Sequence, residues 1–190
     1  MKTLYLERST GSCRNGDWVG ELDLTERPAR IVVGTGPGSF AGIRSALAFA
    51  QGYRLGSGCE VLGLPSACAV CAEAHRALAL APDAPLAVVG DARQGKFWIA
   101  NFVGFGLSGE VFQVERDGLR AAVPDGARVV SPDAGRIGAL LEETFGAAYA
   151  GECLPTARGL EAFAEACPAI LRPEPLPLYL NPAVRPAPSK

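Results

Sequence analysis

The chain of 190 residues has no excess of positive charge and no long apolar run. With a net charge of -2, it lacks the clustered lysine and arginine on which direct nucleic-acid binding depends. No stretch approaches the roughly 20 apolar residues that span a bilayer, and residues 1–10 lack the apolar block of a signal peptide. We therefore expect a globular cytoplasmic protein with no membrane segment and no nucleic-acid-binding surface of its own.

Metal-binding residues are also scarce. Cys68, Cys71 and His75 would share one face of a helix, but His75 is the only histidine in the chain. A structural zinc site needs four ligands, so Cys59 would have to complete it. We predict no metal and no cofactor, and we expect the six cysteines to be free, buried thiols.

Residues 31–54 form the most informative stretch, because they predict a strand, a glycine turn and a helix in succession. Ile31–Val33 is a β-branched run typical of a strand buried on both faces, and Ser39 is a suitable helix N-cap. No Walker lysine follows the glycines, and their spacing is not GxGxxG. A tight structural turn is therefore favoured over an anion site, since the proline also removes one N–H donor. The turn comprises Gly34, Gly36, Pro37, Gly38 and Ser39.

The predicted helix has two apolar faces at a spacing of about 100° per residue. Phe40, Ile43, Leu47 and Ala50 form the expected core stripe. A second face consists of small residues flanked by aromatic rings, so that another helix could approach it closely. This face is either internal to the domain or a site for a partner. The candidate partner-binding residues are Phe40, Ala41, Ser45, Ala48, Phe49 and Gly52.

Three segments resemble the bacterial TsaB (YeaZ) family, whose members are accessory subunits in making threonylcarbamoyladenosine in tRNA. GPGSFAGIR (residues 36–44) resembles the family signature GPGSFTG(L/V)R. DARQGKFWIA (residues 91–100) resembles a family hairpin, and PLYLNPAV (residues 177–184) resembles its terminal motif. The resemblance covers residues 31–185.

The resemblance implies an α/β fold of two ribonuclease H-like lobes of the actin-like ATPase superfamily. We place an N-terminal lobe at residues 1–82 and a C-terminal lobe with a proline-rich tail at residues 83–190. It also implies pairing with a TsaD-type paralogue, with a TsaE-type ATPase as a further possible partner and tRNA bound only indirectly.

Two departures qualify this expectation. Glu7, Arg8 and Ser9 stand where the family has a DTS-like motif, and the helix that normally precedes the GPGSF strand is missing, so the first lobe is abridged. Ser66 and Val70 stand where the catalytic paralogue TsaD carries a metal-binding HxxxH motif. The resemblance therefore implies a non-catalytic subunit and argues against a glycoprotease activity.

Two alternatives remain open. One is a small ATPase or phosphotransferase that uses Glu7 and the glycine turn, although Glu7 could simply pair with Arg8 at the surface. The other is a homodimer without a TsaD partner.

Asp91 and Arg93 could form an acid and an anion clamp, but a local Asx-type turn is favoured.

The remaining pattern predicts further strands and helices. We expect strands at 3–6, 18–24, 61–64, 86–90, 97–103, 110–115 and 129–130, and helices at 66–80, 132–145 and 160–166. From Pro168 the chain is proline-rich and should run extended over the surface and end disordered, with Tyr179 and Leu180 as its anchors.

Overall fold

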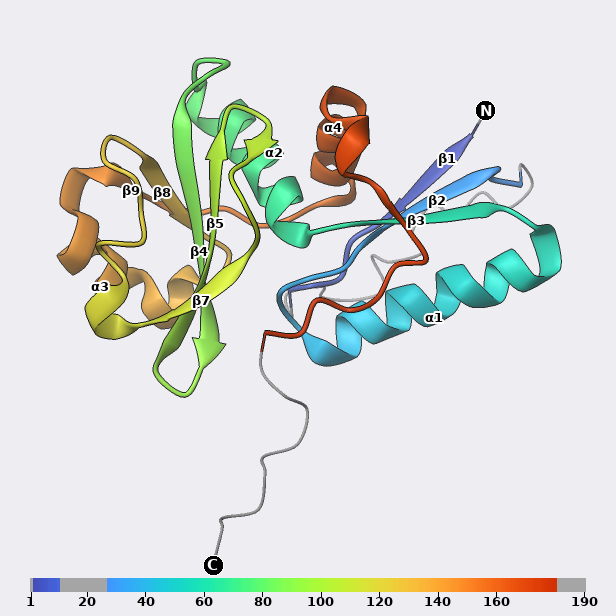
Figure 1. Cartoon of the computed structure of the whole chain (residues 1–190), viewed down its shortest axis with the longest axis horizontal. Helices are drawn as coiled ribbons and strands as arrows, with labels where there is room; N and C mark the ends of the chain where they lie inside the picture. The colour runs from blue at the N-terminus through green and yellow to red at the C-terminus, as the bar shows by residue number, and fades with distance from the viewer. Residues whose placement is uncertain (1, 11–26, 181–190) are drawn as a thin grey trace, which may run out of the picture.

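Two β-sheets form the frame of the molecule (Figure 1). The computed structural model describes residues 2–10 and 27–180. The first sheet has the strand order β1-β2-β3-β10, in which β1, β2 and β3 are parallel and β10 is antiparallel to β3. The second sheet has the order β6-β5-β4-β8-β9, and β7 also pairs with β5. In this sheet, β4, β8 and β9 are parallel to one another, and β5 is antiparallel to β4.

The elements have the following bounds. The strands are β1 (Thr3–Leu6), β2 (Arg30–Gly34), β3 (Glu60–Leu64), β4 (Pro85–Arg93), β5 (Lys96–Val103), β6 (Gly106–Leu107), β7 (Phe112–Glu115), β8 (Arg128–Ser131), β9 (Tyr149–Glu152) and β10 (Arg172–Pro173). The helices are α1 (Phe40–Ser57), α2 (Ser66–Leu78), α3 (Ala134–Phe145) and α4 (Ala157–Ala166).

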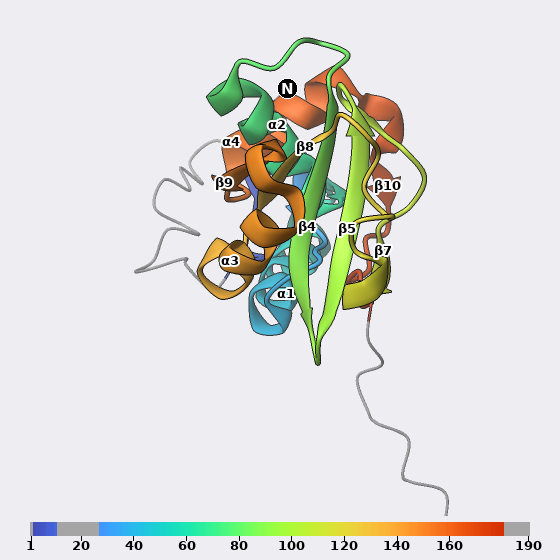
Figure 2. The ribbon, with the colours of Figure 1, turned by 90° about the vertical axis from the view of Figure 1, so that its left-hand side faces the viewer.

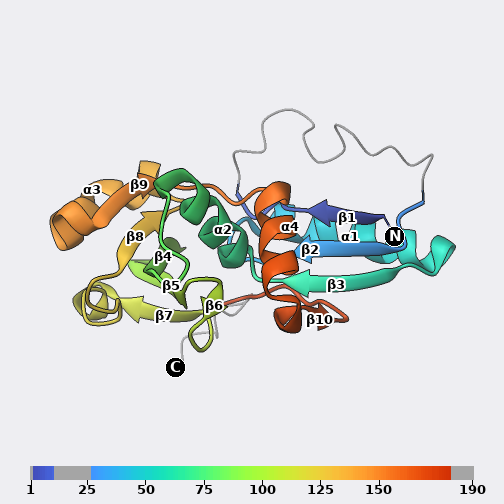
Figure 3. The same ribbon diagram turned by 90° about the horizontal axis from the view of Figure 1, so that it is seen from above.

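The helices and sheets stack in layers. Seen from above, α2 and α4 lie side by side between the two sheets (Figure 3). Helix α1 covers the outer face of the first sheet, and α3 lies beside the long strands β4 and β5 of the second (Figures 1 and 2). Three apolar clusters follow this order: one under α1, one around α2 and α4, and one under α3.

Strand β2 shows how the sequence produces this layering. Ile31 and Val33 pack toward α1, and Val32 packs toward α2, with each of the three side chains at most 1% exposed. Successive side chains of a strand point to opposite faces, so a run of three apolar residues fills both. The predicted strand that is buried on both faces is thereby confirmed.

Helix α4 brings the C-terminal part of the chain back to the first sheet, where it packs on β1 and β2. A Cβ on Gly159 would lie 2.5 Å from the carbonyl oxygen of Ala69, so this glycine allows α4 to approach α2 closely. Strand β10 then pairs with β3. Part of the C-terminal segment thus contributes to the first sheet. The division of the chain into two lobes at residue 82 stays a prediction.

Most of the expected elements are confirmed. All predicted helices are present, as are the predicted strands at 3–6, 31–33, 61–64, 86–90, 97–103 and 129–130. The strand expected at 110–115 is shorter, and β6, β9 and β10 were not predicted. The strand expected at 18–24 lies outside the described residues, as do residues 25–26 of the segment expected to lack a helix and residues 181–190 at the end of the tail. Within residues 2–10 and 27–180, no helix combines the length and apolar character needed to cross a membrane.

Candidate functional site

The turn between β2 and α1 is hydrogen-bonded within the protein. The amide of Gly36 donates to Ser66 Oγ at 3.0 Å, and the amide of Ser39 donates to the carbonyl oxygen of Ser9 at 2.5 Å. Ser39 caps α1 as expected, because its Oγ accepts from the amide of Gly42 at 3.3 Å. These amides are used by the protein itself, which favours the structural turn over an anion site.

The end of β1 passes directly over this turn. A Cβ on Gly38 would lie 2.1 Å from the carbonyl oxygen of Ser9, and one on Gly42 would lie 2.0 Å from that of Arg8. Gly38 also has a φ of +153°, which other residues rarely adopt. The glycines of the GPGSFAG motif therefore allow two backbone segments to touch.

Glu7 lies behind the turn, with a carboxylate oxygen buried, so the expectation of a surface position is wrong. Its Oε1 accepts from the amide of Ser9 at 2.6 Å. Burial raises the pKa of Glu7, and hydrogen bonds with Ser9 and Ser66 partly oppose that rise. A Cβ on Gly34 would lie 1.9 Å from Oε2, so Gly34 makes room for this carboxyl group.

Helix α1 buries one face and exposes the other. Its buried residues are Ile43, Ala46, Leu47 and Ala50. The small-residue face, defined as Ala41, Ser45, Ala48 and Gly52, is largely open: Ser45 is half-buried and the other three are exposed. Nothing among the described residues lies within 4 Å of a Cβ built on Gly52, and Leu55, further along this side of the helix, is 91% exposed. The described part of the chain therefore leaves this face uncovered.

The expected core stripe is wrong at Phe40, whose side chain is 46% exposed. Ala46 is buried in the core instead. Its ring stacks on Tyr179 with the centroids 5.1 Å apart. The guanidinium of Arg44 lies 3.7 Å from the centroid of the Phe40 ring, and Arg44 Nε donates to Tyr179 Oη at 2.6 Å. Residues 40, 44 and 179 thus form an aromatic clamp, and Tyr179 is confirmed as an anchor of the tail.

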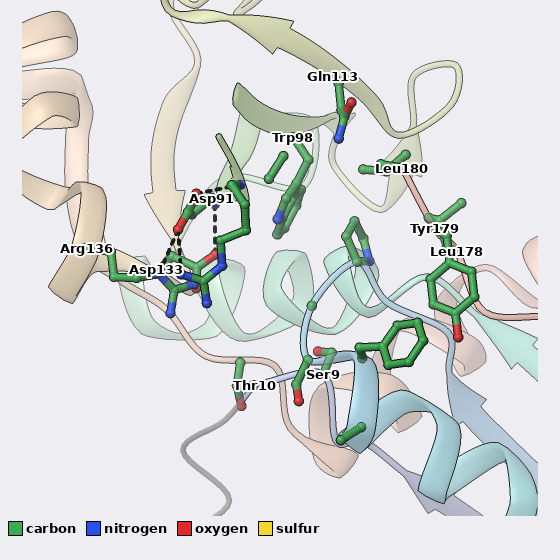
Figure 4. A pocket seen from close by; sticks show the side chains of 17 residues that line it. Ser9, Thr10, Asp91, Trp98, Gln113, Asp133, Arg136, Leu178, Tyr179 and Leu180 are labelled. Carbon is green, nitrogen blue, oxygen red and sulfur yellow. Dashed lines mark hydrogen bonds and ion pairs between the residues drawn. The ribbon is translucent and has the colours of Figure 1, made fainter. Parts of the chain in front are cut away.

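A cleft of ≈ 770 Å³ separates the start of α1 from the second sheet (Figure 4). One side carries Ser9 and the turn, and the other carries Trp98 and the start of α3. The tail closes a third side with Leu178 and Leu180, and the amide of Leu178 donates to the carbonyl oxygen of Thr35 at 2.8 Å. Leu180 packs against the apolar cluster around α2 and α4, which is consistent with the expectation that it helps to anchor the tail.

The polar wall of the cleft is a network of two carboxylates and two arginines (Figure 4). Asp91 Oδ1 accepts from the amide of Arg93 at 2.7 Å, which is the predicted Asx-type turn. Its Oδ2 pairs with Arg136 Nε at 2.8 Å and with Arg93 at 3.4 Å. Asp133 accepts from the amide of Asp91 at 2.9 Å and also pairs with Arg136. Burial raises the pKa of Asp133, although the hydrogen bond from the Asp91 amide and the charge of Arg136 partly oppose the rise. Both carboxylates are thus already engaged in hydrogen bonds and ion pairs within the protein.

The cysteine and histidine cluster of α2 lies in the core and not in the cleft. Cys68, Cys71 and His75 are all buried, and Cys71 Sγ donates to the carbonyl oxygen of Gly104 at 3.4 Å. Burial raises the pKa of Cys68 well above its usual range. The five cysteines of the described part of the chain are free, as expected. Within that part, no group of three or more His, Cys, Asp or Glu residues is placed to hold a metal ion.

Sequence reasoning assigned no role to Arg44, Trp98 and Arg136, although Arg44 and Trp98 lie within the GPGSFAGIR and DARQGKFWIA motifs. Each has an ordinary place in its own segment, and each becomes part of the cleft or the clamp only through contacts with distant segments. The motifs mark two of these segments, but no local pattern in the sequence shows which distant segments they contact.

Comparisons with known proteins agree with this architecture. The sequence profile of the TsaD family, described as tRNA N6-adenosine threonylcarbamoyltransferase, matches residues 20–119. YeaZ from Pseudomonas aeruginosa has a similar structure, with a TM-score of 0.68 and 20% identity over 89% of this chain and 94% of that one. An uncharacterized protein with similarity to peptidase YEAZ from Pseudomonas aeruginosa has a TM-score of 0.63 and 23% identity, over 81% of this chain and 74% of that one. No curated protein matches this chain.

The two-sheet arrangement with α2 and α4 between the sheets defines an α/β protein of the actin-like fold. Because the profile covers more than half of the sequence, the chain belongs to the TsaD family. Together with the structural likeness to YeaZ, this confirms the resemblance to the TsaB (YeaZ) type that the three motifs indicate.

Proposed function

We propose that this protein is a non-catalytic accessory subunit that pairs with a TsaD-type protein in the threonylcarbamoyladenosine modification of tRNA. The pairing surface is the small-residue face of α1, flanked by Phe40 and Phe49. A TsaE-type ATPase is a further partner in this proposal, tRNA is held by the partner, and the site of action is the cytoplasm.

The observation that carries the proposal is the exposure of this face. Ala41, Ala48 and Gly52 are exposed on a helix that has no acidic residue and few charges on this side. Small residues allow two helix backbones to approach closely, so that a partner helix gains many contacts. An uncovered small face beside an exposed leucine is therefore well suited to another helix.

The absence of a catalytic role is supported by the start of α2. Ser66 and Val70 occupy the positions of the TsaD metal ligands, and both side chains are buried. Ser66 Oγ accepts from the amide of Gly36 and so holds the turn. These positions serve packing in this chain, and we assign the chemistry to the partner.

The ATPase alternative has less support. Glu7 is not among the residues that line the cleft, and its carboxyl group is bonded to Ser9 behind the turn. Calorimetry of the isolated chain with ATP and magnesium distinguishes the alternatives. The accessory role predicts no saturable binding, whereas saturable binding that requires magnesium would favour the ATPase or phosphotransferase.

Co-purification with the TsaD-type protein of the same organism tests the proposal. We expect a complex at micromolar concentration that elutes at the summed mass of the two chains. If both proteins are folded and no complex forms, the proposal is wrong. If the chain forms only a symmetric pair with itself through α1, the homodimer alternative replaces it.

A further inference from the structure

The cleft between the start of α1 and the second sheet contains a hydrogen-bond donor that the described part of the protein does not use. Trp98 lines this cleft and is only 3% exposed, and its indole Nε1–H donates to none of the described residues. Unlike Nε2 of His75, this nitrogen is not sealed from solvent. In Figure 4 the indole points from β5 toward the turn that precedes α1. The N–H group is therefore placed to donate to an acceptor in the cleft.

The indole ring is held in a fixed position. A Cβ on Gly90, which pairs with Trp98 across β4 and β5, would lie 2.2 Å from Nε1, so the glycine makes room for the ring. The ring also bounds, together with Ser9 and Gly38, a chamber of ≈ 20 Å³ beside the cleft. Such a chamber has room for about one water molecule. Only a narrow space thus separates the indole from the turn before α1.

The start of α1 supplies further donors to the cleft. The amides of Phe40 and Ala41, two residues that line the cleft, donate to no described residue. The turn amides of Gly36 and Ser39 differ from them, because they are bonded within the protein. First-turn amides point away from a helix along its axis, and the positive end of the helix dipole favours an anion. Both Trp98 and the start of α1 therefore favour an oxyanion in the cleft.

The polar wall limits how much charge this oxyanion can carry. The side chains of Arg93 and Arg136 are 66% and 46% exposed, so both are accessible in the cleft. Asp91 and Asp133 line the same wall, and the two carboxylates balance the two guanidinium groups. A group with several negative charges, such as a polyphosphate, would be repelled by these carboxylates. A single negative charge is the better match to a helix N-terminus with a neutral wall.

The tail gives the cleft an apolar side. Leu178 and Leu180 line it and are half-buried, and the stacked rings of Phe40 and Tyr179 line it as well. The volume of ≈ 770 Å³ is within the range of sites for small organic molecules. Donors on one side and apolar side chains on another suit a ligand with an anionic head and an apolar body.

We propose that this cleft binds a small monocarboxylate with an apolar body. The carboxylate accepts from Nε1 of Trp98 and from the first amides of α1, and the apolar body packs on Leu178, Leu180 and the ring of Phe40. This site goes beyond the pairing proposed for α1 and belongs to the isolated chain.

The indole signal of Trp98 makes the test specific. The chain has two tryptophans, so comparison with Trp18→Phe assigns the indole N–H signals in a proton–nitrogen NMR spectrum. The probe is hexanoate, added to the full chain at pH 7.5 up to about 20 mM, a range that covers the affinity expected of a ligand with so few atoms. We expect a saturable downfield shift of the Trp98 signal. Acetate, which lacks the apolar body, and 1-hexanol, which lacks the charge, should each bind at least about fivefold more weakly.

Ala41→Asp should weaken binding of hexanoate by about tenfold or more, because it places a second carboxylate beside the proposed one. An acidic residue in the first turn suits a helix N-terminus, so the variant should remain folded. Ala139→Asp is the matched control, since it adds the same charge at an exposed alanine of α3 that does not line the cleft. This control should bind hexanoate like the original chain.

A shift of the Trp98 signal that does not saturate, equal binding of hexanoate and 1-hexanol, or equal losses in the two variants would overturn the assignment. Tighter binding of pyrophosphate than of hexanoate would also overturn it, because the cleft would then prefer a polyanion. No TsaD-type partner is present in these experiments, so their failure leaves the proposed pairing untouched.

Discussion

Single residues decide how closely backbone segments approach one another around α1. Gly42 and Gly52 lie in the same helix, but their surroundings differ. A Cβ on Gly42 would meet the carbonyl oxygen of Arg8 at 2.0 Å, whereas one on Gly52 would meet nothing within 4 Å among the described residues. The same substitution should therefore have opposite effects at the two positions.

Gly42→Ala should lower the free energy of unfolding by about 2–4 kcal/mol, because the end of β1 must move away from α1. Gly52→Ala should raise it by about 0.5–1 kcal/mol, since alanine is a better helix former than glycine and has open space here. Urea unfolding of the two variants and the original chain measures both changes. Equal effects would contradict the close contact between residue 8 and the start of α1.

His75 is expected to make stability depend on pH. Burial lowers its pKa from the ordinary value of 6.5, and a hydrogen bond with Gly104 partly opposes this. Below pH 6.5 the unfolded chain therefore takes up the proton before the folded chain does. The contribution of the neutral His75 ring to the free energy of unfolding is complete above pH 6.5. It declines as the pH falls below this value, by at most about 1.4 kcal/mol per pH unit.

An NMR titration of the histidine signals should yield a pKa below 6.5 in the folded chain. In His75→Gln, the free energy of unfolding should change less between pH 5 and pH 6.5 than in the original chain. A measured pKa at or above 6.5 would show that the ring is not buried in its neutral form.

At the scale of elements, the tail is held to the start of α1 by the aromatic clamp of residues 40, 44 and 179. Tyr179→Phe removes the hydrogen bond from Arg44 but keeps the ring stack, whereas Tyr179→Ala removes both. The clamp is partly exposed, so the cost should be about 0.5–1 kcal/mol for the first variant and about 1–2 kcal/mol for the second.

Hydrogen exchange at the amide of Leu178, which donates to the carbonyl oxygen of Thr35, measures the effect locally. Exchange should be faster in Tyr179→Ala than in Tyr179→Phe, while the amides of β2 stay protected in both. Unchanged exchange at Leu178 in Tyr179→Ala would mean that the clamp does not hold the tail.

The sequence predicts elements whose pattern is local and misses those that depend on distant contacts. The β-branched run at 31–33 and the N-cap Ser39 carry their own signals, and both predictions are confirmed. Strand β10 has only two residues, one of them a proline, and exists because it pairs with β3. Phe40 fits the helical spacing of a core residue, yet it lies where the tail, and not the sheet, covers it.

The candidate site shows the same contrast. The GPGSF turn is visible as a motif, whereas the network of Asp91, Asp133 and Arg136 joins segments that are far apart in the sequence. Glu7 was expected at the surface because it neighbours a charged residue, but the packing of the turn buries its carboxyl group. Burial of this kind depends on the whole fold.

At the scale of the whole molecule, the layers leave α1 covered on one side only. The first sheet buries Ile43, Leu47 and Ala50, and none of the described elements covers the opposite face. Phe40 and Ala41 belong to the candidate partner face and also line the cleft. A partner seated on α1 would therefore border the cleft directly.

Ala48→Glu is the most direct test of the proposed pairing. A charge at the centre of the small-residue face would be desolvated in a helix pair, and we expect affinity for the TsaD-type partner to fall by at least about 100-fold. Because Ala48 is exposed, the thermal unfolding of the isolated chain should stay nearly unchanged. Ala139→Glu is the control, since it places the same charge at an exposed alanine of α3.

The measurement is the molecular mass of each variant mixed with the partner, determined by light scattering after size-exclusion chromatography. The account predicts a complex for the original chain and for Ala139→Glu, and two separate folded proteins for Ala48→Glu. A complex of undiminished affinity with Ala48→Glu would contradict the account, because the partner would then have to bind elsewhere on the molecule.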